Sequence, residues 1–186
     1  MTHDCRITEF GPPIYRDHPR TEDLVLDRPY VIAVHNVCYV APATGWPFDG
    51  ASIPRLLWRV VGPPLRGMYR RGAVVHDPAY KGLLLAFHID RQVDMIPIRN
   101  DLRDNPKGIP ATLLDRPQLS IGRAEADDLL FAVSVWNGTN PTKAAIMRRA
   151  VRLFGAGIWR AEHAKWAHLQ YVMQPPNDSA QPPKSV

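Results

Sequence analysis

A histidine and an aspartate that adjoin each other are the residues of this chain with the clearest chemical potential. In the stretch VHDPAY (75–80), His76 and Tyr80 are four residues apart, so they would share one face of a helix. Asp77 would point about a quarter of a turn away. A histidine is a natural general base near neutral pH, since its reference pKa is about 6.5, provided that another group fixes its ring. One helix can thus present a base and a separate metal ligand.

An aspartate in a later segment is the candidate to orient this histidine. Asp127 lies in a stretch with helical periodicity and would reach His76 if the two helices pack side by side. Its neighbour Asp128 is the alternative, because periodicity does not fix the register between two helices. A plain ion pair of Asp127 with Arg123, four residues earlier, is the competing structural interpretation.

Asp77 is also a candidate calcium ligand. Calcium takes about six to eight oxygen ligands, so one carboxylate would need help from backbone carbonyls, water and a second acidic residue. The glycine-containing segment 45–52 can turn its carbonyls inward, and Asp49 within it can add that carboxylate. The residues therefore predict a calcium site built on Asp77 and Asp49, with a simple turn at Asp49-Gly50 as the alternative.

The elements that must position these residues are strands first and helices later. The apolar runs 24–26, 30–34 and 37–40 predict a small antiparallel β-meander. Apolar spacing then predicts three to four helices, which cover Met68 to about Tyr80, Ala124–Trp136, Thr142–Phe154 after Pro141, and Ile158–Tyr171. We expect Pro78 to kink the first helix, and Gly155 and Gly157 to separate the last two.

Between the first two helices the sequence is hard to interpret. Residues 81–120 contain several prolines and few periodic apolar positions, so we expect a long irregular excursion with a short hairpin around Val93 to Ile98. The fold class predicted is α+β, with one globular domain over residues 1–173. Four prolines among polar residues predict that the tail, 174–186, is disordered.

Composition narrows the class of protein. The chain has 186 residues, 45% of them hydrophobic and 22% charged, which is the balance of a folded globular domain. Two cysteines argue against a disulfide framework. We see neither a signal peptide nor a run of about 20 apolar residues, and expect a cytoplasmic protein without a transmembrane segment. The net charge of +5 comes from scattered arginines, so nucleic acid is not expected as a specific partner.

Several short motifs taken together resemble a phage and bacterial family, domain of unknown function 1353. The resemblance covers roughly Tyr30 to Trp159, and it is carried by DGASIP (49–54), Trp58, GPP (62–64), AVVHD (73–77) with Tyr80, and Arg123 with Ala126-Asp127. Members are commonly encoded by tailed phages and prophages. The resemblance implies a phage-related origin, with other virion subunits as partners and a place in the bacterial cytoplasm or in the assembled particle.

A more distant resemblance implies a mechanism. A helix with His-Asp and a tyrosine three residues later, followed by a helix with Ala-Asp, is similar to the core of phospholipase A2 enzymes. This likeness implies that His76 activates water, Asp77 holds Ca²⁺, Asp127 orients His76, and Tyr80 supports the hydrogen bonds. It also implies a phospholipid or another ester as substrate. The glycine-rich calcium-binding pattern of those enzymes is replaced here by Asp49-Gly50-Ala51.

Two other classes of function compete with a calcium-dependent hydrolase. In a non-enzymatic tail or capsid protein, the same His-Asp-Asp cluster would be a buried polar network that fixes helix packing. A metal phosphohydrolase of the histidine-aspartate type would add His35 and a further aspartate as ligands. The second class ranks lower, because those enzymes are all-helical and His35 falls in a segment predicted as strand.

Overall fold

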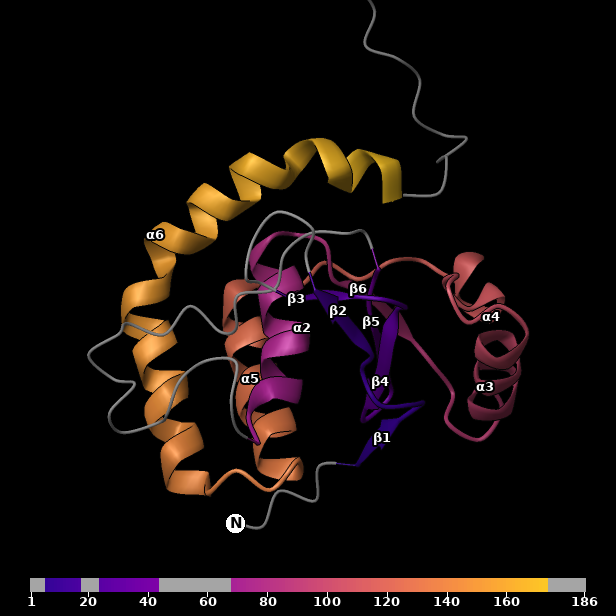
Figure 1. Cartoon of the computed structure of the whole chain (residues 1–186), viewed down its shortest axis with the longest axis horizontal. Helices are drawn as coiled ribbons and strands as arrows, with labels where there is room; N and C mark the ends of the chain where they lie inside the picture. The colour runs from indigo at the N-terminus through magenta and orange to yellow at the C-terminus, as the bar shows by residue number, and fades with distance from the viewer. Residues whose placement is uncertain (1–5, 18–23, 44–67, 174–186) are drawn as a thin grey trace, which may run out of the picture.

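A four-stranded antiparallel sheet forms the centre of the fold in this computed structural model, which describes residues 6–17, 24–43 and 68–173. Its strands run in the order β1-β4-β5-β6, and they are β1 (Ile7–Glu9), β4 (Tyr30–Val34), β5 (Val37–Ala41) and β6 (Leu85–His88) (Figure 1). A separate two-stranded sheet pairs β2 (Tyr15–Asp17) with β3 (Leu24–Leu26).

The central sheet is buried on both faces, which explains the unbroken apolar runs of β4 and β5. Successive side chains of a strand point to opposite faces. Tyr30, Ile32 and Val34 accordingly lie in one hydrophobic cluster, whereas Val31 and Ala33 lie in another. A two-residue turn joins the strands, so Val34 pairs with Val37. Helices must therefore cover both sides of the sheet.

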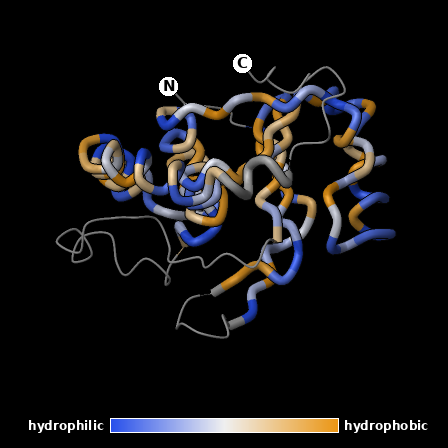
Figure 2. The backbone as a smooth tube through the Cα atoms, turned by 90° about the horizontal axis from the view of Figure 1, so that it is seen from above, coloured by the Kyte–Doolittle hydropathy of each residue, from blue (hydrophilic) through white to orange (hydrophobic). Residues whose placement is uncertain are grey.

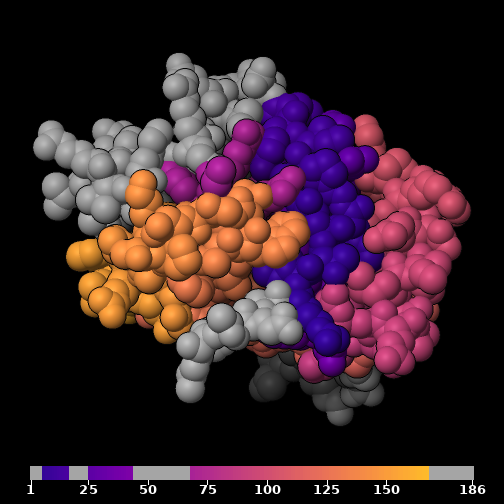
Figure 3. Space-filling view, turned by 90° about the horizontal axis from the view of Figure 1, so that it is seen from below, coloured from indigo at the N-terminus to yellow at the C-terminus, as the bar shows by residue number. Residues whose placement is uncertain are grey.

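Five described helices supply that cover: α2 (Arg70–Tyr80), α3 (Met95–Asp104), α4 (Ala111–Leu114), α5 (Arg123–Trp136) and α6 (Pro141–Met173). The larger cluster joins one face of the sheet to α2, α5 and α6. The smaller cluster joins the other face to Ile98 of α3 and Leu113 of α4. Figure 3 shows the strand residues between α6 on one side and the α3–α4 region on the other.

The predicted α+β class is confirmed, as are the strands at 24–26, 30–34 and 37–40 and the helices that became α2 and α5. Pro78 lies inside the last turn of α2. One detail of the meander was wrong. Leu24–Leu26 pairs with β2 outside the central sheet, and β4 and β5 have β1 and β6 as their outer neighbours.

The expected irregular excursion at 81–120 was wrong, because it contains β6, α3 and α4. The expected hairpin at Val93 to Ile98 is instead a turn that leads into α3. Pro97 misled the prediction: it is the third residue of α3, in the first turn, where a backbone N–H has no intrahelical partner and proline is tolerated.

The expected break at Gly155 and Gly157 was also wrong. Helix α6 is continuous from Pro141 to Met173, and Figure 1 shows it running along α5 and then curving across the end of α2. A glycine costs a helix about 1 kcal/mol relative to alanine, and tertiary packing can outweigh that cost. Asp49, its segment 45–52 and the tail 174–186 lie outside the described residues.

The helices are amphipathic or mixed. Figure 2 shows hydrophilic and hydrophobic residues interspersed along the helical coils. Among the residues described, none of the helices is both long enough and apolar enough to cross a bilayer.

The role of α3 can be tested with two isoleucines of that helix. Ile98 is completely buried against the sheet, whereas Ile96 is 70% exposed. Ile98→Ala should lower the free energy of unfolding by about 2–5 kcal/mol through lost burial and the cavity left behind. Ile96→Ala should change it by less than about 0.5 kcal/mol. Equal effects in chemical denaturation would contradict the packing of α3 on the sheet.

Candidate functional site

Close packing of α2 against α5 brings the two predicted segments together. Gly72 makes this approach possible, because a Cβ atom there would lie 2.7 Å from the carbonyl oxygen of Leu130 and would collide with Ser134 Oγ. Every residue of α2 from Gly72 to Tyr80 is buried. The side chain of His76 therefore faces α5 from inside the protein.

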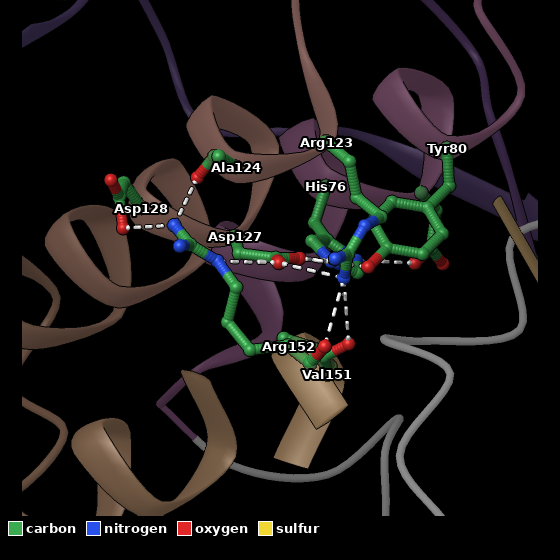
Figure 4. A network of polar contacts seen from close by, with 9 residues as sticks. His76, Tyr80, Arg123, Ala124, Asp127, Asp128, Val151 and Arg152 are labelled. Carbon is green, nitrogen blue, oxygen red and sulfur yellow. Dashed lines mark hydrogen bonds and ion pairs between the residues drawn. The ribbon is translucent and has the colours of Figure 1, made fainter. Parts of the chain in front are cut away.

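Asp127 is the residue of α5 that forms a hydrogen bond with His76. Its Oδ1 atom lies 3.2 Å from His76 Nε2 and accepts a 2.8 Å hydrogen bond from the hydroxyl of Tyr80 (Figure 4). His76 and Asp127 are both 0% exposed. The structure thus brings together three predicted site residues from segments that are about 50 positions apart in the sequence.

The second oxygen of Asp127 is held by two arginines. Arg152 Nε lies 2.9 Å and Arg123 Nη1 lies 3.6 Å from Oδ2. Arg152 also donates to the Ala124 carbonyl at 2.6 Å, and Arg123 donates to the carbonyl of Arg152 at 3.0 Å. The Asp127 carboxylate therefore ties α2, α5 and α6 to one point.

The predicted ion pair of Asp127 with Arg123 coexists with its contact to His76. The alternative partner, Asp128, is half-exposed and pairs with Arg148 and Arg152. The register between α2 and α5 accordingly selects Asp127 as the neighbour of the imidazole.

The proton positions on His76 follow from these partners. Because an ionised carboxylate only accepts hydrogen bonds, Nε2 must carry the hydrogen that Asp127 Oδ1 receives. In the neutral ring, Nδ1 then holds a free electron pair. Nδ1 lies 3.5 Å from Asp77 Oδ1, and neither Nδ1 nor Asp77 Oδ2 has a hydrogen-bond partner among the residues that the structure describes. This edge of the ring is thus buried, and its nitrogen makes no hydrogen bond to a described residue.

Burial and nearby charges oppose each other in setting the two pKa values. Burial alone would lower the pKa of His76, but the hydrogen bond to Asp127 and the Asp77 carboxylate outweigh it, so the pKa lies above the ordinary 6.5. Burial alone would raise the pKa of Asp127, but hydrogen bonds from His76 and Tyr80 and the charges of His76 and Arg123 hold it below 3.8. Asp127 therefore stays ionised near neutral pH.

Tyr80 is held in place from the side of α6. Its ring meets the edge of Trp159 at 5.0 Å, and Trp159 stacks on His163 at 4.1 Å between ring centroids. Gly155 leaves room for the phenol, because a Cβ atom there would collide with Tyr80 Oη and come within 3.2 Å of its ring carbons. Burial, followed by the charge and hydrogen bond of Asp127, raises the pKa of Tyr80, which stays a donor.

Arg152 and Gly155 were not predicted as residues of this site. Arg152 was counted among scattered surface arginines, and Gly155 was interpreted as a helix break. Both act through the point at which α6 crosses α5 and α2, and local sequence pattern carries no signal for that crossing.

Of the two predicted calcium ligands, Asp77 and Asp49, only Asp77 lies within the described residues. Asp77 is buried, and its Oδ2 is an oxygen of the kind that calcium prefers. Within the described ranges, no three His, Cys, Asp or Glu side chains converge to hold a metal ion. Asp49, the second predicted ligand, is outside those ranges, so calcium binding stays a prediction.

A family model described as protein of unknown function (DUF1353) matches residues 24–151, well over half of the chain. The chain belongs to this family. The matched region of DUF1353 begins at β3 and ends in α6, so it contains His76, Asp77, Tyr80 and Asp127 and stops one residue before Arg152. The predicted resemblance to this family is confirmed.

The other comparisons gave one short match and no match to a solved structure. A relative described as uncharacterized protein y4jT of Sinorhizobium fredii (strain NBRC 101917 / NGR234) is 47% identical over 34 residues, which are 18% of this chain and 10% of that protein. The match thus spans about a tenth of the relative's length. No solved structure matches this chain. The likeness to phospholipase A2 therefore stays a prediction.

The raised pKa of His76 makes the stability of the fold depend on pH. A group with a raised folded-state pKa stabilises the fold fully below its unfolded pKa, here 6.5, and this contribution is lost as the pH rises through the folded-state pKa. Chemical denaturation should therefore show a larger difference in stability between wild type and His76→Gln at about pH 5.5 than at about pH 9. Asp127 stays ionised throughout, since its pKa is lowered. Exposed His88→Gln is the control, and a pH-independent difference for His76 would refute the assignment.

Gly155 and Gly157 provide a matched pair within α6. Gly155→Ala should cost about 1–3 kcal/mol, because its methyl group would displace Tyr80 from Asp127. A Cβ atom on Gly157 meets nothing within 4 Å, so Gly157→Ala should stabilise the helix by up to about 1 kcal/mol. Thermal and chemical unfolding measure both. Similar shifts in the two variants would contradict the contact between Tyr80 and α6.

Proposed function

We propose that this protein is a hydrolase in which His76 is the general base and Asp127 orients it. The observation that carries the proposal is the difference between the surroundings of the two ring nitrogens of His76. Nε2 is committed to a fully buried, ionised carboxylate, whereas Nδ1 carries an unbonded electron pair beside Asp77 once the pH exceeds the raised pKa of His76. A base needs this combination of a fixed ring and a free nitrogen.

The proposed proton path uses only these side chains. Nδ1 of His76 takes a proton from an attacking water, while the Nε2 hydrogen stays bonded to Asp127 Oδ1. The imidazolium that forms is stabilised by the carboxylates of Asp127 and Asp77. The same Nδ1 proton then passes to the leaving alcohol, and the ring returns to its neutral form. Tyr80 and the two arginines keep Asp127 in position throughout.

The substrate class and the metal are the finer part of the proposal, and the likeness to phospholipase A2 supports them. We propose an ester of the phospholipid type as substrate. Asp77, with its unpartnered buried Oδ2, and Asp49 would hold Ca²⁺. A calcium ion held there would act as a Lewis acid toward the ester carbonyl.

Hydrolysis of phospholipid vesicles and calcium titration together test this proposal. Wild type should release fatty acid in a calcium-dependent reaction, and His76→Gln should lower the rate by at least about a hundredfold, since a positioned base contributes about 10² to 10⁴. Asp77→Asn should abolish stoichiometric calcium binding in calorimetry.

Two controls separate chemistry from folding. His88→Gln replaces an exposed histidine and should keep the full rate, and Asp128→Asn replaces a carboxylate of the arginine cluster and should keep calcium binding. If folded wild type neither hydrolyses the vesicles nor binds calcium, the proposal is wrong.

The complete burial of the His76–Asp127 pair favours a second candidate, a structural subunit of a phage particle. The contacts of Asp127 with His76, Tyr80 and Arg152 also connect α5 to α2 and α6, and a buried, fully paired carboxylate can serve packing alone. This candidate predicts that His76→Gln lowers the melting temperature and assembly with no catalytic rate to lose. Its decisive support would be the chain in purified virions, such as tails or capsids, at a fixed copy number.

A further inference from the structure

Helix α6 carries an exposed stripe that has no part in the buried site. Leu153 is 75% exposed and Phe154 beside it is 61% exposed, so two large apolar side chains adjoin each other at the surface. Steps of three and four residues place Leu153 on one helix face with Arg149, Ala156, Gly157, Arg160 and Ala164, all of them exposed. We call this face, with Phe154 at its border about 100° around the helix from Leu153, the α6 stripe, and it extends about 22 Å at 1.5 Å per residue.

The stripe is the outer face of α6, opposite the buried Val151 and Gly155, and most of it lies where α6 extends beyond α5. The first residue of α5, Arg123, donates to the carbonyls of Val151 and Arg152, so α5 begins at that level. Figure 1 shows α6 continuing past this end of α5. Val151 faces the core, whereas Leu153 and Phe154 follow it at the point where the cover by α5 ends.

The charged residues of α6 are mostly positive. The helix has six lysines and arginines against one glutamate, a surplus of five positive charges that equals the net charge of the whole chain. Arg148 and Arg152 are paired with aspartates of α5. Lys143, Arg149 and Arg160 are exposed, and among the described residues they have no ion pair. Two of these three flank Leu153 along the stripe.

We propose that the α6 stripe docks the protein on the surface of an anionic phospholipid bilayer. Exposed leucine and phenylalanine can enter the boundary between head groups and acyl chains, and arginines along the same helix attract the negative lipids. If a second copy of the chain docked on this face, the positive charges of the two copies would repel each other. A nucleic acid would satisfy the arginines but leave the two apolar side chains in water. The proposal concerns docking, and hydrolysis at His76 is a separate step on the same lipid.

Co-sedimentation with vesicles tests the docking surface. The full chain, in the presence of a calcium chelator, is mixed with vesicles of phosphatidylserine and phosphatidylcholine or of phosphatidylcholine alone. We expect binding to the first kind. Leu153→Ser with Phe154→Ser should weaken it by at least about tenfold, because apolar burial is lost. Arg149→Gln with Arg160→Gln should weaken it by about 25-fold, at about fivefold per arginine.

The α3 helix and the turn before it offer matched controls on another part of the surface. Val93 and Ile96 are 64% and 70% exposed, and Arg99 and Arg103 are exposed as well. Val93→Ser with Ile96→Ser, and Arg99→Gln with Arg103→Gln, remove the same kinds of group and should leave binding within about twofold of wild type.

The outcomes separate this proposal from its rivals and from the proposed function. No preference for phosphatidylserine vesicles, or equal loss in the α3 controls, would overturn it. So would binding of duplex DNA that depends on Arg149 and Arg160 but not on Leu153 and Phe154. His76→Gln should bind vesicles like wild type, so a failed hydrolysis assay leaves docking intact. Conversely, hydrolysis of a soluble ester without vesicle binding would refute docking alone.

Discussion

The burial of one ionised carboxylate is the constraint on which the helical half of this protein depends. A buried charge is costly unless opposite charges and hydrogen-bond donors surround it. Asp127 meets this requirement with His76 and Tyr80 from α2, Arg123 from its own helix and Arg152 from α6. Any arrangement of the three helices that lost these donors would leave the charge uncompensated. The geometry at His76 is therefore fixed by the same contacts that fix the helix packing.

The close approaches around this carboxylate need residues without side chains. Gly72 lets α2 reach α5, and Gly155 lets the phenol of Tyr80 lie against α6. The sheet contributes in a different way, since its two buried faces hold α2 on one side and α3 on the other. A rigid support of this kind is what a general base requires, and it is equally what a structural subunit requires. Chemistry at the unbonded Nδ1 atom is what separates the two.

The parts that were predicted correctly are those with a strong local pattern. The apolar runs of β4 and β5 and the periodic apolar residues of α5 indicate their structures without tertiary information. The prediction failed where tertiary contacts decide. Leu85–His88 is a strand because β5 offers an edge, Pro97 is tolerated because it lies in a first turn, and α6 passes through two glycines because it packs on α2 and α5. The choice between Asp127 and Asp128 depended on the register between α2 and α5, which periodicity does not fix, and no periodicity argument pointed to Arg152.

The protonation state of His76 tests the arrangement of His76 and Asp127 most directly. Nitrogen NMR of protein labelled in its histidine rings distinguishes the two neutral tautomers and the imidazolium. At a pH above the raised pKa of His76, we predict the tautomer with hydrogen on Nε2 and none on Nδ1, because Asp127 Oδ1 can only accept. A neutral ring with its hydrogen on Nδ1, or a pKa below the ordinary 6.5, would contradict the account.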